Sequence, residues 1–222
     1  MKYNSAFDII GPVMVGPSSS HTAGPIRIGN IARQILAETP MQAEFQLMGS
    51  FAETYQGHGT DLALLAGVLG LGTDADEVPR ADKKAEELEL AYKFIPANLG
   101  FYHPNTVAIS LTGASRTVRL IASSLGGGKV EVQELEDLPI KFSAENPALI
   151  MYHTDEKGFL ANVSRILDAN GYNIARLSLE RWRRGGTAIT LCEVDGEIQP
   201  ELLSTLQDSL PYLREIRFVH VD

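Results

Sequence analysis

The sequence is poor in the residues that hold metal clusters, cross-link chains or span membranes. Cys192 is the single cysteine among 222 residues. One thiol forms no disulfide within the chain, and it cannot hold an iron–sulfur cluster by itself, because such clusters take several thiolates. No apolar run approaches the ~20 residues of a membrane-spanning helix, and the first residues show no signal-peptide pattern. These absences predict a cytoplasmic protein with no membrane anchor.

Positive charge is also in short supply. The chain has 19 Lys and Arg residues against 28 Asp and Glu residues, a formal net charge of −9. Such a surface repels a phosphate backbone, which argues against a nucleic-acid partner. The phosphate-loop pattern GxxxxGK(S/T) and the nucleophile elbow GxSxG are both missing from the sequence. No lysine stands in a persuasive context for pyridoxal phosphate.

The most distinctive stretch runs from Gly16 to Pro25, GPSSSHTAGP, in which hydroxyl side chains surround His21. An apolar stripe follows it at helical spacing, at Ile28, Ile31, Ala32, Ile35 and Leu36. The pattern predicts a helix that begins near Pro25, with Thr22 or Ser20 as its N-cap. The serine-rich stretch therefore stands directly at a helix start.

A helix start of this kind can bind an anion. Its N-terminus carries about half a positive charge and several unpaired N–H groups, which attract a carboxylate or a phosphate. Three serines, Ser18, Ser19 and Ser20, and the imidazole of His21 would surround such an anion. Two interpretations remain open from this stretch alone: a binding site for a small acid, or a helix cap that has a histidine beside it.

A second histidine, His58, lies between two glycines in the stretch Gly49–Asp61, which we expect to form a loop. Because glycine has no side chain, the backbone can approach a ligand closely there and the ring stays accessible. The alternative interpretation is a turn in which the glycines adopt positive φ and the histidine is merely solvated.

The rest of the first 137 residues reads as strands and helices. Strands are predicted at 42–48, 107–112, 116–123 and 129–135, and helices at 61–71 and 74–94. Pro104 keeps His103 out of the helical region, so HPNT at 103–106 is a loop that enters a strand. The segment 138–147 contains two prolines and no periodicity, and we interpret it as a linker.

Residues 148–222 have a clear order of elements. Strands are predicted at 148–154, 173–182, 187–194 and 213–221, and helices at 158–171 and 200–210. The order βαββαβ is that of the ferredoxin-like unit. The fold class is therefore α+β.

One part of this unit, YHTDEKGFLANV at 152–163 followed by Asn173-Ile174, resembles an ACT domain. In that family small molecules, often amino acids, bind at the loop after the first strand and across a pair of domains. The resemblance implies a candidate effector loop at Asp155, Gly158 and Asn162. Many members carry Asp-x-Pro-Gly in this loop, and here Lys157 stands in place of the proline.

Three motifs taken together, SSSHTAGP, GHGTD and HPNT, strongly resemble the β chain of the bacterial iron–sulfur L-serine dehydratases, over essentially the whole chain. Residues 1 to about 140 also look like the allosteric substrate-binding domain that precedes an ACT domain in some 3-phosphoglycerate dehydrogenases. These resemblances imply a substrate-binding α/β domain at 1–137, a linker at 138–147 and an ACT domain at 148–222.

The dehydratase resemblance implies a lyase that converts L-serine to pyruvate and ammonia. It also implies that a separate α chain supplies the cysteines of a [4Fe–4S] cluster. By hypothesis Ser18, Ser19, Ser20 and Thr22 hold the substrate carboxylate, and Asn105 adds a polar contact. We expect His58 to be the base for the α-proton, since an imidazole with a pKa near ~6.5 is poised at neutral pH.

In the same hypothesis His21 orients the substrate or shuttles protons, and the two histidines remain exchangeable as the base. We expect a homodimer through the ACT domain or a heterotetramer with the α chain. The competing interpretation is a non-catalytic regulatory module that binds an amino acid or a phospho-acid at the same helix start, without titration of either histidine.

Overall fold

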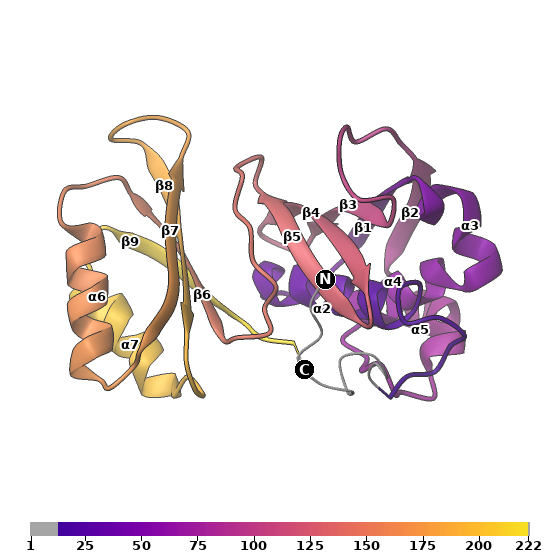
Figure 1. Ribbon diagram of the computed structural model, residues 1–222, viewed down its shortest axis with the longest axis horizontal. Helices are drawn as coiled ribbons and strands as arrows, with labels where there is room; N and C mark the ends of the chain where they lie inside the picture. The colour runs from indigo at the N-terminus through magenta and orange to yellow at the C-terminus, as the bar shows by residue number, and fades with distance from the viewer. Residues whose placement is uncertain (1–12, 222) are drawn as a thin grey trace. The chain divides into compact units, whose positions relative to one another are not determined.

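The structure, a computed structural model, describes residues 13–221, which separate into two compact units. The first unit comprises the described residues up to Asp137 together with Lys141–Ser143, and the second comprises Leu138–Ile140 and the described chain from Ala144 onward. Each unit has one sheet with its own helices (Figure 1), and the predicted α+β class is confirmed. Every helix within residues 13–221 is too short or too polar to span a bilayer.

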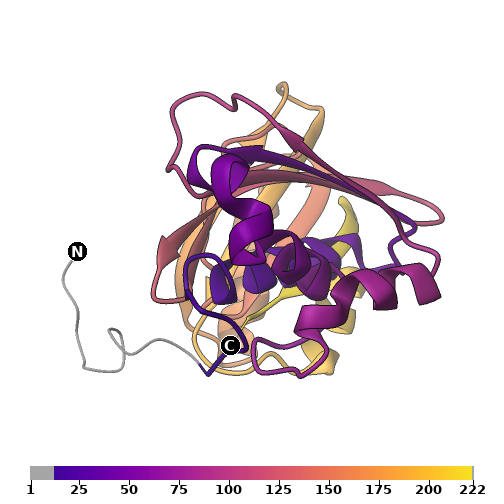
Figure 2. The same ribbon diagram turned by 90° about the vertical axis from the view of Figure 1, so that its right-hand side faces the viewer.

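The first unit is built on a five-stranded sheet in the order β2-β1-β3-β4-β5. Its strands are β1 (Gln42–Met48), β2 (Ala91–Pro96), β3 (Thr106–Thr112), β4 (Thr117–Gly126) and β5 (Lys129–Leu135). β1 and β2 run parallel, and the other neighbouring pairs are antiparallel. The helices cover one face of this sheet (Figure 2), and Phe45 and Leu47 of β1 are fully buried. The four strands predicted before residue 137 are confirmed.

The described helices of the first unit are α2 (Ala23–Leu36), α3 (Ser50–His58), α4 (Thr60–Val68), the 3-10 turn η1 (Val78–Arg80) and α5 (Ala81–Glu87). The predicted stripe of α2 is confirmed, because Ile28, Ile31 and Ile35 are at most 1% exposed. The predicted side-chain cap is wrong: Thr22 is the N-cap residue, but among the described residues its hydroxyl makes no capping bond.

α2 and α4 cross in direct backbone contact at two glycines. A Cβ added at Gly29 would lie 2.8 Å from the Cα of Gly67, and one added at Gly67 would lie 2.1 Å from the carbonyl oxygen of Ile26. The atoms in the way belong to backbone, which cannot rotate aside as a side chain can. Only glycine therefore permits this crossing, and the crossing fixes α4 against α2.

The stretch Gly49–Asp61, predicted as a loop, contains the helix α3. Phe51 is 0% exposed and anchors this short helix in the core. Because helices of this length depend on tertiary packing, local sequence is a poor guide to them. Gly59 ends α3 with a φ of +68°, the left-handed conformation that glycine adopts most easily at this position.

The charged stretch 74–94, predicted as one surface helix, is helical only in η1 and α5. Glu89 has a φ of +54°, and the chain continues as the strand β2. The ring of Phe94 stacks on that of Phe45 in β1, with centroids 4.6 Å apart. Strand pairing with β1 and this aromatic contact outweigh the helix propensity of the charged residues.

The second unit confirms the predicted βαββαβ order. Its elements are β6 (Ala148–Thr154), α6 (Phe159–Ala169), β7 (Ile174–Arg181), β8 (Thr187–Val194), α7 (Pro200–Ser209) and β9 (Leu213–Val219). The strands pair antiparallel in the order β7-β8-β6-β9, so the first and third strands of the unit lie in the centre. Leu149, Val163 and Leu206 are among the side chains buried between the sheet and its two helices.

We predict that Gly67→Ala destabilises the first unit by about 3 kcal/mol, since the new methyl group would collide with the backbone of α2. Gly57→Ala is the matched control, because a Cβ at Gly57 in α3 would meet nothing within 4 Å. That change should leave the free energy of unfolding unaltered or raise it by up to about 1 kcal/mol. Urea denaturation of the two variants measures the difference, and equal midpoints would contradict the crossing.

Candidate functional site

The serine-rich stretch forms a tight turn that leads directly into α2. The amides of Thr22 and His21 both donate to the carbonyl of Ser18, at 2.8 and 3.2 Å. The turn brings three side chains into a row. Ser18 Oγ lies 3.1 Å from Ser20 Oγ, which in turn lies 3.1 Å from Nδ1 of His21. The hydroxyls and the imidazole at this helix start thus form one hydrogen-bonded chain.

α3 meets the opposite side of His21. Ser50 and His58 are the first and last residues of α3, and their spacing places them on the same helix face. Ser50 Oγ lies 3.2 Å from Nε2 of His21. The rings of His21 and His58 meet edge to face, with centroids 4.8 Å apart and planes at 83°. The structure therefore brings the two candidate catalytic histidines together.

Ser50 is the member of this cluster that the sequence did not reveal. Ser50 falls in the stretch that the sequence predicts as a loop, where spacing gives no information about the direction of a side chain. Had α3 been recognised as a helix, the positions of Ser50, Thr54 and His58 at i, i+4 and i+8 would have put Ser50 on the face of His58.

The HPNT stretch at 103–106 contacts Gly49, the residue that precedes Ser50 of this cluster. Gly49 has a φ of +54°, and a Cβ there would lie 2.7 Å from the carbonyl oxygen of Pro104. The amide of Asn105 donates to Nδ1 of His103 at 3.2 Å, and its carbonyl accepts the amide of Ser124 at 2.9 Å. These backbone bonds fix the position of Asn105, while the role of its side chain stays a prediction.

Ser19 and Thr22 take part in the turn through their backbone. The carbonyl of Ser19 accepts the amide of Gly24 at 2.9 Å. Thr22 is 3% exposed, and its side chain lies against Gly16, where an added Cβ would come within 2.4 Å of Thr22 Oγ1. The hydroxyl of Thr22 is therefore turned inward, whereas that of Ser19 belongs to a partly exposed residue.

The two histidines have different surroundings. His21 is 8% exposed, and His58 is exposed. Burial lowers the pKa of His21 below the ordinary value of an imidazole, and the neighbouring charge of His58 lowers it further. The neutral imidazole that results has one donor and one acceptor nitrogen. His21 can therefore take or pass on a proton inside the protein, and His58 is open to a molecule that arrives from solvent.

Comparison with known proteins identifies the family. A family profile described as "Serine dehydratase beta chain" matches residues 5–98. The "Probable L-serine dehydratase, beta chain" of Bacillus subtilis is 38% identical to this chain. The alignment covers 97% of this chain and 98% of the relative. The chain belongs to the L-serine dehydratase β-chain family. The "L-serine dehydratase, beta chain" of Peptoniphilus asaccharolyticus is 37% identical over 91% of this chain and 92% of the relative.

The β chain also has a weaker likeness to a dehydrogenase. D-3-phosphoglycerate dehydrogenase of Bacillus subtilis is 25% identical over 81% of this β chain and 34% of the dehydrogenase. Among solved structures, the ACT domain from a GTP pyrophosphokinase of Chlorobium tepidum aligns with 33% of the β chain at 13% identity and a TM-score of 0.27. That score is too low to bear on the fold.

The donor set of this β chain does not fit an iron–sulfur cluster. Cys192 is buried in the core of the second unit, and burial raises the pKa of its thiol to about 12. A thiol of that pKa stays protonated at neutral pH, whereas metals bind the thiolate. Within residues 13–221, no group of three or more His, Cys, Asp or Glu side chains is arranged to hold a metal ion. The described part of the β chain therefore offers no ligand set for the cluster.

The candidate effector loop of the β chain is hydrogen-bonded to the hairpin formed by β7 and β8. Asp155 Oδ2 accepts hydrogen bonds from the amide of Gly185 at 2.9 Å and from Nη1 of Arg181 at 2.5 Å. Both hydrogen bonds lower the pKa of this carboxyl group, and the bond from the Gly185 amide has the larger effect. Gly158, with a φ of +90°, precedes α6, and its carbonyl accepts the amide of Asn162 at 3.0 Å. Effector binding at this loop stays a prediction.

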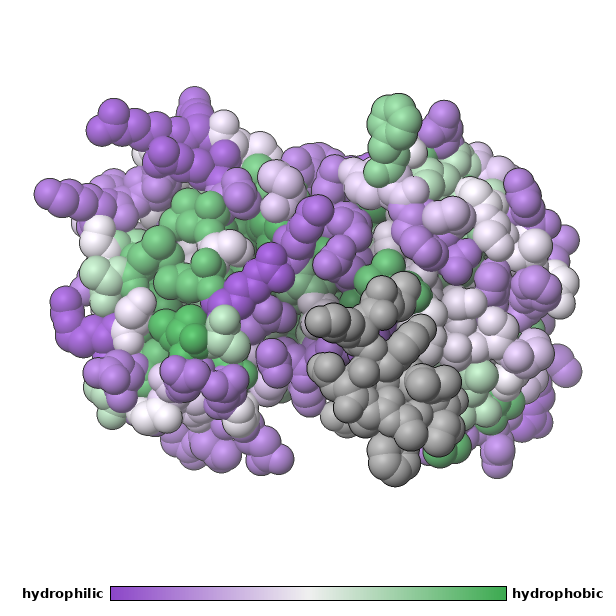
Figure 3. Space-filling view, viewed as in Figure 1, coloured by the Kyte–Doolittle hydropathy of each residue, from purple (hydrophilic) through white to green (hydrophobic). Residues whose placement is uncertain are grey.

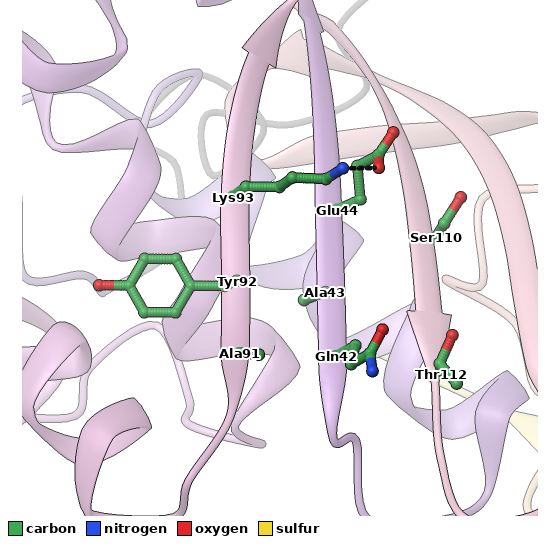
Figure 4. A pocket seen from close by; sticks show the side chains of 8 residues that line it. All are labelled: Gln42, Ala43, Glu44, Ala91, Tyr92, Lys93, Ser110 and Thr112. Atoms are coloured by element: carbon green, nitrogen blue, oxygen red, sulfur yellow. Dashed lines mark ion pairs between the residues drawn. The ribbon is translucent and has the colours of Figure 1, made fainter.

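A shallow pocket of about 270 Å³ lies on the sheet of the first unit, away from the predicted residues (Figure 4). It is lined by Gln42, Ala43, Glu44, Ala91, Tyr92, Lys93, Ser110 and Thr112. Its charges are already paired, because Glu44 accepts Lys93 Nζ at 2.7 Å and Gln46 Nε2 at 2.8 Å. These bonds lower the pKa of Glu44, so its carboxyl group is ionised near neutral pH.

We predict that His21 titrates below an ordinary imidazole and that His58→Asn raises its midpoint. The rise should be partial, because burial is the larger cause of the shift and persists in the variant. NMR titration of the histidine ring protons in the full chain measures both midpoints. His103→Gln serves as the control and should leave His21 unchanged. An unaltered midpoint in His58→Asn would show that the two rings do not interact.

Proposed function

We propose that this chain is the β subunit of an L-serine ammonia-lyase, which deaminates L-serine to pyruvate and ammonia in the cytoplasm. A separate α subunit holds the [4Fe–4S] cluster in this proposal. Family membership supports the reaction class. The observation that carries the proposal is the contact of His21 with Ser20, Ser50 and His58, which joins two distant motifs in one polar centre.

In this proposal the chain binds the carboxylate group of the substrate and accepts the proton that the substrate loses. The start of α2, with Ser18, Ser19 and Ser20, holds the substrate carboxylate, and Asn105 adds a polar contact. Thr22, whose hydroxyl is turned inward, belongs to this site as part of the turn. His58 takes the α-proton, because its ring is exposed, and His21 behind it orients the substrate or accepts the proton in turn. Loss of the α-proton and the hydroxyl group leaves an enamine, which hydrolyses to pyruvate and ammonia.

The domain division follows the same proposal. Residues 1–137 form the substrate-binding domain, 138–147 the linker and 148–222 the ACT domain. An amino acid binds at the loop of Asp155, Gly158 and Asn162. Since Arg181 and Gly185 already hold the Asp155 carboxylate, an effector must displace them or bind the neighbouring groups of the loop.

Assembly through the ACT domain is supported by the edge of its sheet. β7 lies at one edge of the four-stranded sheet, and an edge strand has backbone groups ready to pair with another strand. Apolar side chains gather over β7 and the neighbouring α6 in Figure 3. Leu160 of α6 and Ile174 and Leu177 of β7 are partly exposed. A homodimer through this edge, or a heterotetramer with two α subunits, would cover them.

A non-catalytic regulatory module is the second candidate function. The observation in its favour is the likeness of 81% of this chain to a third of the Bacillus subtilis dehydrogenase. In this interpretation the helix start at Ser18–Ser20 binds an amino acid or a phospho-acid and regulates a partner, and neither histidine changes its protonation.

We predict that His58→Ala lowers pyruvate formation by roughly 100-fold or more in the anaerobically co-expressed two-chain complex, as expected for loss of a general base. His220→Asn in the second unit is the matched control and should retain full activity. A rate within about tenfold of the parent, which corresponds to less than ~1.4 kcal/mol of barrier, excludes His58 as the base.

We also predict that the purified chain is colourless and forms no pyruvate by itself, because it lacks the cluster ligands. Addition of a brown, cluster-bearing α chain under anaerobic conditions should restore serine-dependent pyruvate formation. The measurement is a coupled pyruvate assay with each chain omitted in turn. If no such partner confers activity on a folded chain that still binds L-serine, the regulatory module is the better interpretation.

A further inference from the structure

His21 has a hydroxyl group on each of its two ring nitrogens. Ser20 meets Nδ1 from the adjacent position in the chain, at 3.1 Å, and Ser50 meets Nε2 across 29 positions, at 3.2 Å. Ser20 follows the backbone of the turn and moves with it. Ser50 reaches the ring only because folding brings α3 there, so this bond ties the orientation of the ring to the rest of the unit.

The local structure directs the hydroxyl of Ser50 to the ring. Gly49 is the N-cap residue of α3 and Ser50 its first helical residue. The close contact of Gly49 with Pro104 fixes the backbone before Ser50, and Thr54 Oγ1 donates to the carbonyl of Ser50 at 2.7 Å. With its backbone held on both sides, Ser50 places its hydroxyl by a single side-chain rotation.

In a neutral imidazole the two ring nitrogens have different hydrogen-bonding roles, and so do the hydroxyl groups that they contact. The ring has one N–H and one lone pair, so it donates to one hydroxyl and accepts from the other. Burial favours the neutral form of His21 at neutral pH. The row continues beyond Ser20 to Ser18. The direction of the hydrogen bonds on the Ser20 side is therefore coupled to the bond on the Ser50 side.

We infer that Ser50 is a positioning residue, which fixes the ring orientation and the tautomer of His21 through Nε2. The inference deepens the proposed function and names a further residue of the same site. Its effect on the tautomer needs no catalysis, whereas its effect on turnover rests on the proposed role of His21.

The first test uses the full chain labelled with ¹⁵N at histidine. Long-range ¹H–¹⁵N spectra should show one neutral tautomer for His21 in the parent, and in Ser50→Ala an averaged mixture with a displaced titration midpoint. Ser50→Thr keeps the hydroxyl and should restore the parent pattern. Ser204→Ala, at an exposed serine of α7, is the matched control. Unchanged nitrogen shifts and midpoint in Ser50→Ala overturn the inference.

A folding defect in Ser50→Ala does not end the test. Ser50→Cys is close in size to the parent and replaces the hydroxyl with a weak donor, so it is scored by the same criteria if circular dichroism shows Ser50→Ala to be unfolded. A mixed tautomer in the folded cysteine variant supports the inference, and an unchanged one overturns it.

The second test measures turnover in the two-chain complex. Loss of the Ser50 hydrogen bond should lower kcat about tenfold and change KM less than twofold, with recovery in Ser50→Thr. A changed tautomer with unchanged kcat supports the positioning of His21 but contradicts its part in the proposed function. If neither the tautomer nor kcat changes, the positioning role itself is wrong.

Discussion

The backbone contact between Gly29 of α2 and Gly67 of α4 is the constraint on which the candidate site depends. His21 stands shortly before α2 begins, and His58 is followed by Gly59 and then α4. Each histidine is thus carried near the start of one of two helices that touch without an intervening Cβ. Backbone contacts deform less than contacts between long side chains, so the distance between the two helix starts is well defined. Near these two helix starts the rings of His21 and His58 approach to 4.8 Å between centroids.

Patterns with a strong period predicted the fold well. The apolar stripe of α2, the alternation of β1 and the βαββαβ order of the second unit are all present where the sequence placed them. The predictions were wrong in two segments, 49–61 and 74–94, whose structure depends on tertiary contacts. Phe51 holds α3 in the core, and Phe94 joins β2 to β1 through an aromatic stack. Neither contact leaves a periodic signal in its own segment, so the sequence predicts neither the helix α3 within 49–61 nor the strand β2 that begins at Ala91.

The candidate site shows the same division between local and long-range information. His21 and His58 stood out because each lies among small or hydroxyl residues, and the structure places their rings in contact. Ser50 had no such signal, since its partner is 29 positions away. The part of the site that lies within one motif was accessible from the sequence. The bond that joins the two motifs required knowledge of how α3 packs.

His21 is buried and His58 is exposed, so the two imidazoles of the pair are not equivalent. A buried, neutral His21 cannot gain a lasting charge without cost, because its surroundings and the nearby His58 both oppose protonation. Burial therefore favours the neutral form of His21, which is hydrogen-bonded to two hydroxyl groups and lies against the exposed ring of His58. The centre consists of hydroxyl groups and imidazoles, and within residues 13–221 no group of three or more His, Cys, Asp or Glu side chains is arranged to hold a metal ion. Burial also raises the pKa of the Cys192 thiol to about 12, so among the described residues the hydroxyls and imidazoles around His21 are not accompanied by a thiolate that could bind a metal.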